Sequence, residues 1–410
     1  MCYYGIKKHY AELFISIIAI FPTINYYLAE FLTALELPTL SLWFYSVIYG
    51  TAFVSYFYIF LKMEIKSLLT VTLAGMVYIF TLFVSPDSYK IIIGSEIPSS
   101  YLAVFWFTVL PPFFLTLTKI DLTYLTELLY KFSTNVILLI VISFAVRVFY
   151  KHAPLTNYMS FAYQGLLSVM LCVYMSLKKK NFLRFIISMG ACACIILAGC
   201  RGAALTLIVF LAIVIFSAPG MKKGIHYITI LLTINISLIV FVCLDSIISY
   251  VSCKLIAQDF ESRTLYMFLT GEFLSDSGRG VIQSKILAES GLLPNGLYGD
   301  FAAVGVYSHN WIVEILCNFG YLIGPLIIFI IIFILMKSAV LYGKENSVRF
   351  FWTASAISMM LIKYMVSSSP LITFEFMFLA GLLTNMLYIQ KQNAISGKYI
   401  VRITGIRQVK

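Results

Sequence analysis

Residues 307–336 read YSHNWIVEILCNFGYLIGPLIIFIIIFILM, a short polar segment that runs directly into a long apolar one. A helix needs about 20 mostly apolar residues to cross a bilayer, and this run satisfies that requirement. Residues 245–308 before it form the one long polar stretch between apolar segments. The stretch therefore predicts a membrane span that begins where a polar loop ends, and we expect the chemistry of the protein at that junction.

The composition of the whole chain predicts a polytopic membrane protein. Of 410 residues, 61% are hydrophobic and 11% are charged, whereas soluble proteins carry about 25% charged residues. The apolar runs are too long and too uniform for barrel strands, so the fold class is all-α. We expect about twelve spans, at residues 11–31, 37–61, 67–85, 101–118, 132–149, 155–177, 182–199, 202–218, 226–247, 310–336, 350–368 and 370–390.

Charge sets the orientation and the domain layout. With both termini cytoplasmic, 20 of the 29 basic residues fall inside, eight fall outside, and Lys363 lies within a span. This asymmetry follows the positive-inside rule, so the net charge of +11 reports topology and does not indicate nucleic-acid binding. The layout is nine spans in residues 1–247, an outer loop at 248–308, three spans in 309–390, and a basic cytoplasmic tail at 391–410.

The outer loop is patterned. Glu261–Phe273 and Val281–Leu293 have the apolar spacing of short amphipathic helices that lie on the membrane surface or on the bundle. A turn ending at Gly278 can cap the second helix. Residues 291–305 are rich in glycine, which predicts a flexible connection back to the membrane.

The eight cysteines include no C-x-x-C pair, so we expect no zinc, haem or disulfide framework, and no cofactor. One histidine and one glutamate at the junction are too few for a metal site.

Four of the eight arginines lie on the outer side, where the positive-inside rule discourages them: Arg147, Arg201, Arg263 and Arg279. Arginine suits bidentate contact with phosphate or carboxylate groups. Arg201 is the sharpest case, because it lies in a hinge with almost no loop. The alternatives are that Arg201 snorkels to the outer headgroups and that the others lie on solvated surfaces.

His309, Asn310 and Glu314 form a second polar group at the outer end of a span, with Asn310 and Glu314 four residues apart on one helix face. An unperturbed histidine titrates near pH 6.5, so a His309 that faces the periplasm would be largely neutral there without special burial. The alternative is that His309 is a packed or capping residue.

These segments resemble the O-antigen polymerases (Wzy type) and the related O-antigen ligases, which are bacterial inner-membrane glycosyltransferases of the GT-C kind. The resemblance covers about residues 190–325. It rests on the Gly-Cys-Arg-Gly-Ala hinge at 199–203, Ser-Gly-Arg-Gly at 277–280, Leu-Pro-Asn-Gly-Leu-Tyr-Gly at 293–299, and Tyr-Ser-His-Asn leading into Ile-Val-Glu-Ile-Leu. Cys200 stands where serine is usual, and Ser308 where proline is common.

The resemblance implies transfer of a growing glycan from undecaprenyl pyrophosphate to a lipid-linked repeat unit, with inversion, without a metal ion, and at the periplasmic face. Arg201 and Arg279 would stabilise the leaving pyrophosphate, with Arg263 and Arg147 binding substrate. His309 would act as base or orient the acceptor hydroxyl, and Asn310 and Glu314 would orient His309 or a sugar hydroxyl. A chain-length regulator is a further expected partner.

Two alternatives remain open at this point. An O-antigen ligase, which moves the finished glycan to lipid A–core, needs the same arginine and histidine groups. A transporter or flippase for a lipid-linked oligosaccharide would also place arginines in the membrane, although the chain shows no internal repeat of the kind found in many transporters.

Overall fold

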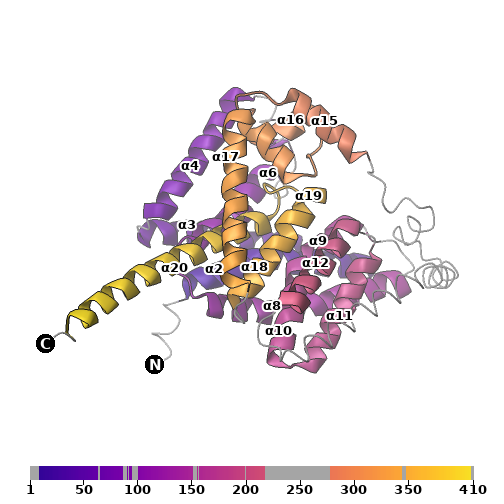
Figure 1. Cartoon of the computed structure of the whole chain (residues 1–410). Coiled ribbons are helices and arrows are strands. Elements are labelled where there is room, and N and C mark those ends of the chain that lie inside the picture. Colours follow the sequence, from indigo (N-terminus) through magenta and orange to yellow (C-terminus); the bar gives the residue numbers. More distant parts are fainter. Residues whose placement is uncertain are drawn as a thin grey trace.

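The structure is a computed structural model of the chain (Figure 1). It describes residues 9–62, 65–85, 90, 92–94, 100–150, 155, 157–198, 200–217, 278–343 and 348–407, with the backbone alone for 62, 65–67, 82, 148–149 and 391–407. This part of the chain is helical, and no strand occurs in it. The elements are α2 (Tyr10–Ala34), α3 (Ser41–Lys62), α4 (Ile65–Val84), α6 (Tyr101–Val104), η1 (Phe105–Val109), α7 (Leu110–Thr116), α8 (Leu122–Ala145), η2 (Val146–Tyr150), α9 (Tyr158–Gln164), α10 (Leu166–Lys179), α11 (Phe182–Leu197), α12 (Arg201–Ser217), α15 (Arg279–Glu289), α16 (Gly299–Val304), α17 (Trp311–Tyr342), α18 (Val348–Ser358), η4 (Met359–Lys363), α19 (Tyr364–Val366) and α20 (Phe374–Arg407).

The expectation of an all-α fold is confirmed for the described residues, and their apolar helices are compatible with a membrane protein. Within the described residues, five helices are long and apolar enough to cross a bilayer, and several shorter apolar helices accompany them. The expected span at 226–247 and the expected amphipathic helix at 261–273 lie outside the described residues. The segment expected as a basic tail at 391–410 continues α20 as helix up to Arg407.

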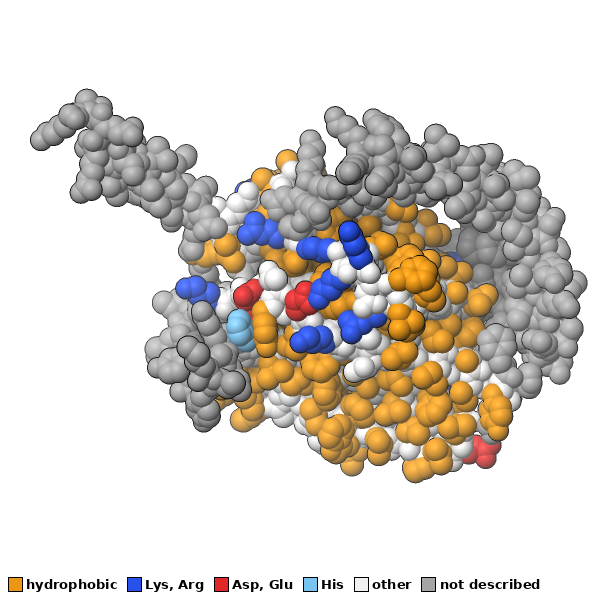
Figure 2. All heavy atoms as spheres, turned by 90° about the horizontal axis from the view of Figure 1, so that it is seen from below, with side chains coloured by type: hydrophobic (Ala, Val, Ile, Leu, Met, Phe, Trp, Pro, Cys, Tyr) orange, Lys and Arg blue, Asp and Glu red, His pale blue; other side chains and the backbone are white. Residues whose placement is uncertain are grey.

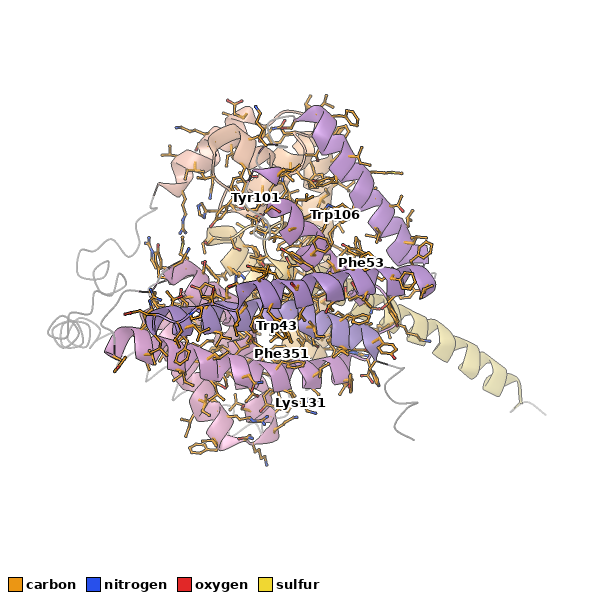
Figure 3. All side chains as sticks on the ribbon, turned by 180° about the vertical axis from the view of Figure 1, so that it is seen from behind. Trp43, Phe53, Tyr101, Trp106, Lys131 and Phe351 are labelled. Carbon is orange, nitrogen blue, oxygen red and sulfur yellow. The ribbon has the colours of Figure 1, made fainter. Side chains whose placement is uncertain are left out.

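Large apolar side chains cover the outside of the bundle. Phe53 on α3 is 70% exposed, Phe83 on α4 is 81% exposed and Val340 on α17 is 80% exposed; Figure 3 labels Phe53 on α3. Soluble proteins rarely expose such large apolar surfaces to water, whereas lipid tails can cover them. These helix faces are therefore the ones that contact lipid.

Buried polar contacts join helices that are distant in sequence. The indole of Trp352 on α18 donates to Thr126 Oγ1 on α8 at 2.9 Å. The amide of Asn385 on α20 donates to the carbonyl of Thr118 at 3.1 Å. Such interhelical hydrogen bonds help to fix packing where lipid removes the hydrophobic drive between helices.

The two ends of the bundle differ in chemistry. The helices α15 and α16 lie at the top of Figure 1, and the turn between α10 and α11 lies at the bottom. Lysines 178–180 in that turn are exposed, and Lys179 pairs with Glu127. Figure 3 labels Lys131 at the same lower end, opposite Tyr101, and basic side chains gather on the face seen from below in Figure 2. Lys131 and lysines 178–180, which were expected inside, thus lie at the end opposite α15 and α16, which were expected outside.

This arrangement gives a topology prediction. Reporter fusions placed after Lys180 and after Ser290 should report opposite sides of the membrane, with Lys180 cytoplasmic, because the exposed lysines follow the positive-inside rule. Alkaline phosphatase and green fluorescent protein fusions measure this. Finding both positions on one side would contradict the orientation.

The expectation of a flexible connection at residues 291–305 is wrong. The helix α17 breaks at Gly320, where φ is 70° and ψ is 170°, and a β-carbon there would meet the Leu292 carbonyl oxygen at 2.5 Å. The preceding segment fills the break. The N–H of Tyr321 donates to the Gly291 carbonyl at 2.9 Å, and the N–H of Gly296 donates to the Asn318 carbonyl at 3.0 Å. The segment thus satisfies the backbone groups that the break frees, so it is held in place.

The expected second amphipathic helix is present as α15 and lies on the bundle, although it ends at Glu289 and not at Leu293. Its Ile286 is fully buried and packs with Val313 and Cys317 of α17. Burying one isoleucine stabilises such a contact by about 2 kcal/mol. The helix begins after Gly278, whose φ of 76° suits glycine. This docking fixes where Arg279, the first residue of α15, can lie.

Candidate functional site

Arg279 lies at the start of α15 and contacts the broken end of a membrane helix. Its Nη1 donates to the carbonyl oxygen of Val366, the last residue of α19. The helix stops there, because Ser367 is extended and Ser368 has a φ of 71°. A free carbonyl at a helix end carries partial negative charge, which suits a guanidinium.

The hinge before α12 packs against the same helix end at Val366. A β-carbon on Gly202 would lie 2.0 Å from the Tyr163 hydroxyl and 2.8 Å from Val366 Cγ2. The Tyr163 hydroxyl hydrogen bonds with the side chains of Cys200 and Ser367, and the charge of Arg279 acts on it. Only a residue without a side chain lets α12 start so close to α9 and α19. The hinge and Arg279, 79 positions apart, therefore meet in space.

His309 forms the third side of this group. Its ring lies 4.1 Å from the ring of Tyr307, centroid to centroid. Tyr307 in turn hydrogen bonds with Ser367, and the charge of Arg279 acts on it. His309 Nδ1 is buried and has no hydrogen-bond partner among the described residues.

The environment of His309 corrects the expectation of an unperturbed histidine. Burial, followed by the positive charge of Arg279, lowers the pKa of His309 to about 4. The ring is thus neutral at neutral pH, as expected, but because burial and the charge of Arg279 disfavour the cation. A neutral imidazole accepts a hydrogen bond or a proton through one nitrogen.

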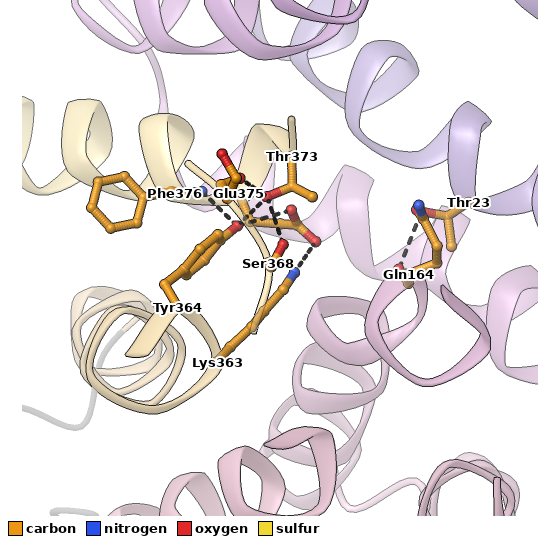
Figure 4. Close-up of polar contacts among 9 residues, drawn as sticks. Thr23, Gln164, Lys363, Tyr364, Ser368, Thr373, Glu375 and Phe376 are labelled. Carbon is orange, nitrogen blue, oxygen red and sulfur yellow. Dashed lines mark hydrogen bonds and ion pairs between the residues drawn. The ribbon is translucent and has the colours of Figure 1, made fainter. Parts of the chain in front are cut away.

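A buried ion pair closes the loop that carries Ser367. Lys363 Nζ lies 2.9 Å from Glu375 Oε1, and both side chains are almost fully buried (Figure 4). The Tyr364 hydroxyl lies 2.7 Å from Thr373 Oγ1 and donates to Glu375 at 3.2 Å. Lys363, noted above as a lone charge within a span, therefore has a partner. The pair joins the two ends of residues 363–375 and fixes the Val366 carbonyl.

Asn310 and Glu314 both have structural partners. Asn310 Oδ1 accepts from the N–H of Ile312 at 3.0 Å and so caps α17. Glu314 is 2% exposed and accepts from Ser369 Oγ at 2.7 Å. These contacts anchor the start of α17 and the 367–373 loop.

The other three arginines expected on the outer side are Arg201, Arg147 and Arg263. Arg201 is the first residue of α12, directly after Cys200, so its backbone belongs to the hinge. Arg147 Nη1 lies 2.9 Å from Glu30 Oε2, an ion pair with both side chains mostly buried, and its charge is therefore already balanced. Arg263 lies outside the described residues.

Sequence reasoning missed several residues of this site. Tyr163, Tyr307 and Ser367 lie on three different segments, and nothing in their local sequence marks them as neighbours. The sequence assigns no role to Asp300. A carboxylate that the structure buries to 1% exposure could not be told from a solvated one in a polar loop.

The donor set favours an anion over a metal ion. In the described part of the chain, no three His, Cys, Asp or Glu side chains lie together so that they could hold a metal. The site offers a guanidinium, a neutral imidazole and two phenols. Comparisons with protein-family models, with curated proteins and with solved structures find no match.

The hinge gives a second prediction. Gly202→Ala should lower activity by at least tenfold, because the new methyl group overlaps Tyr163 and Val366 and pushes the start of α12 away. The matched control is Gly190→Ala on α11, whose β-carbon would meet only Val141 Cγ2 at 3.7 Å. Activity per folded protein measures the effect. Equal activity of the two variants would show that the hinge is not tightly packed.

Proposed function

We propose that the protein is an O-antigen polymerase that joins undecaprenyl-pyrophosphate-linked repeat units at the periplasmic face of the bacterial inner membrane. The observation that carries the proposal is the meeting of Arg279, His309 and the Cys200–Gly202 hinge at one point. The pairing of a guanidinium with a neutral imidazole suits a reaction in which phosphate leaves and a hydroxyl loses its proton.

These groups account for the bond that forms, the bond that breaks and the proton that is lost. A hydroxyl oxygen of the acceptor sugar attacks C1 of the donor glycan, and the bond from C1 to the pyrophosphate oxygen breaks with inversion. Arg279, with Arg201 beside the hinge, binds the pyrophosphate as its negative charge grows. His309 takes the proton of the attacking hydroxyl. The fold proposed for the whole chain is GT-C-like, with about twelve spans and both termini cytoplasmic.

Binding of the donor makes His309 a stronger base. In the empty site, the charge of Arg279 helps to hold the pKa of His309 at about 4, where it is a weak base. A bound pyrophosphate brings negative charge that offsets Arg279, so the pKa of His309 rises when the donor is in place. The base thereby gains strength only when there is a leaving group.

Reconstitution tests the proposal. The purified protein in lipid nanodiscs, supplied with undecaprenyl-pyrophosphate-linked repeats, should produce a ladder of longer lipid-linked glycans and release undecaprenyl pyrophosphate. Transfer only when lipid A–core is added would identify a ligase. Movement of repeats across a proteoliposome bilayer without any joining would identify a flippase. The ligase is the second candidate, because it uses the same groups.

A further inference from the structure

The backbone of His309 is held in an uncommon conformation. Its φ is 56°, in the left-handed region that residues with a side chain seldom adopt. Such a conformation persists only where the surroundings fix it. The direction in which the imidazole points depends on this backbone, so whatever holds the turn also aims the ring.

Hydrogen bonds hold the turn on both sides. The N–H of Ser308 donates to Asp300 Oδ2 at 2.9 Å. Ser308 Oγ donates to the Asn310 carbonyl at 2.8 Å and accepts from the Asn310 N–H at 3.3 Å. His309 lies between these two residues. Asp300, on α16, is thus a side chain from another element that this chain of contacts reaches.

The position of Asp300 is itself fixed. It is the second residue of α16, and its side chain is 1% exposed. The N–H of Gly299 donates to Asn318 Oδ1 at 2.9 Å. A β-carbon on Gly299 would lie 2.9 Å from Asn295 Cβ. The start of α16 is therefore packed against α17 just before the Gly320 break. The hydrogen bond from Ser308 to Asp300 connects the His309 turn to this packed region.

We propose that Asp300 is a positioning residue that holds the His309 turn in its left-handed conformation through the N–H of Ser308, and so aims the imidazole at the acceptor hydroxyl. Asp300 itself touches no substrate. The proposal deepens the polymerase function and rests on it for the role of His309. The contact between Asp300 and the turn does not depend on which reaction occurs.

The charge on Asp300 gives the contact a pH dependence. Burial raises the pKa of Asp300 to about 6, although hydrogen bonds from Ser308 and nearby backbone oppose this. The titratable groups that face it are Tyr298 on α16, Tyr101 on α6, and Glu314 and Cys317 on α17. None of these is a cation. An ionised carboxylate accepts a stronger hydrogen bond than a neutral one, so the turn is held more firmly above that pKa.

Activity profiles from pH 5 to 8 test the proposal. The wild-type kcat/KM should fall about fivefold to a plateau as Asp300 becomes protonated, the size expected when a charged hydrogen bond becomes a neutral one. Asp300→Asn should lie on that lower plateau at every pH. Asp300→Ala should lose about 100-fold in kcat with little change in KM, because the base is misplaced. Glu289→Gln, an exposed acid on α15, is the matched control and should match wild type.

A second readout does not need catalysis. In a protein with His309 as its sole histidine, diethyl pyrocarbonate should acylate His309 about tenfold faster in Asp300→Ala than with Asp300, because the released turn exposes the buried nitrogen. Wild-type pH profiles and unchanged acylation in both Asp300 variants would overturn the inference. Faster acylation in a protein that makes no polymer would leave the inference standing and reject the proposed function.

Discussion

Arg279→Lys should lower polymer formation by about 100-fold at equal protein level, the scale seen when one donor to a developing charge is removed. Lysine keeps the positive charge but loses the planar fork that can bind pyrophosphate through two hydrogen bonds. Arg279 also contacts the Val366 carbonyl, which anchors the guanidinium at the helix end. The measurement is the rate of ladder growth with purified protein and lipid-linked repeats.

The control for Arg279 lies on the same helix. Lys285 on α15 is exposed, and Lys285→Ala should retain wild-type polymer formation. Near wild-type activity of Arg279→Lys would show that charge alone matters there, and Arg279 would then be a helix-start residue on a solvated surface. A loss in both variants would point to damage to α15 rather than to the site.

His309→Ala should reduce polymer formation by about 1,000-fold while the protein still inserts and accumulates, which lies within the usual contribution of a general base. His309→Gln should retain some activity only if the role is hydrogen bonding, because an amide accepts a hydrogen bond but does not take a proton at a useful rate. His226→Ala, at the start of the span expected at residues 226–247, is the control and should behave as wild type.

The pH dependence of the same reaction distinguishes the free enzyme from the enzyme with bound donor. The pH dependence of kcat/KM reports the free enzyme, in which the pKa of His309 is about 4. The fall in kcat/KM caused by protonation of His309 should therefore lie near pH 4. The limb of kcat should lie at higher pH, because bound pyrophosphate offsets Arg279 and raises the pKa of His309. Normal polymer from His309→Ala, or identical limbs in kcat and kcat/KM, would contradict this role.

The helical fold class could be predicted because it depends on local properties. Apolar length identifies spans whatever their neighbours are, and the lysine asymmetry predicted the exposed basic end at residues 178–180. Arg279 and His309 were identifiable as candidates because a charged or titratable residue stands out beside apolar spans. The polymerase activity itself stays a prediction.

The roles of particular side chains could not be predicted. The hydrogen bond of Glu314 with Ser369 and the capping of α17 by Asn310 depend on the fold, and the substrate-binding role expected for both residues stays a prediction. Residues 291–305 looked flexible because glycine is common there, yet that segment fills the break at Gly320. Glycine permits both a mobile chain and a close backbone approach, and sequence alone does not distinguish them.

The sequence by itself determined that the chain is a helical membrane protein with its polar chemistry gathered before Trp311, since hydropathy and charge are additive along the chain. Only the tertiary structure decided that the hinge at Gly202, the helix start at Arg279 and the turn at His309 meet at the broken end of α19. Those contacts join segments separated by up to 164 residues, from Gly202 to Val366. Backbone breaks and buried hydrogen bonds fix them, and neither leaves a periodic signal in sequence.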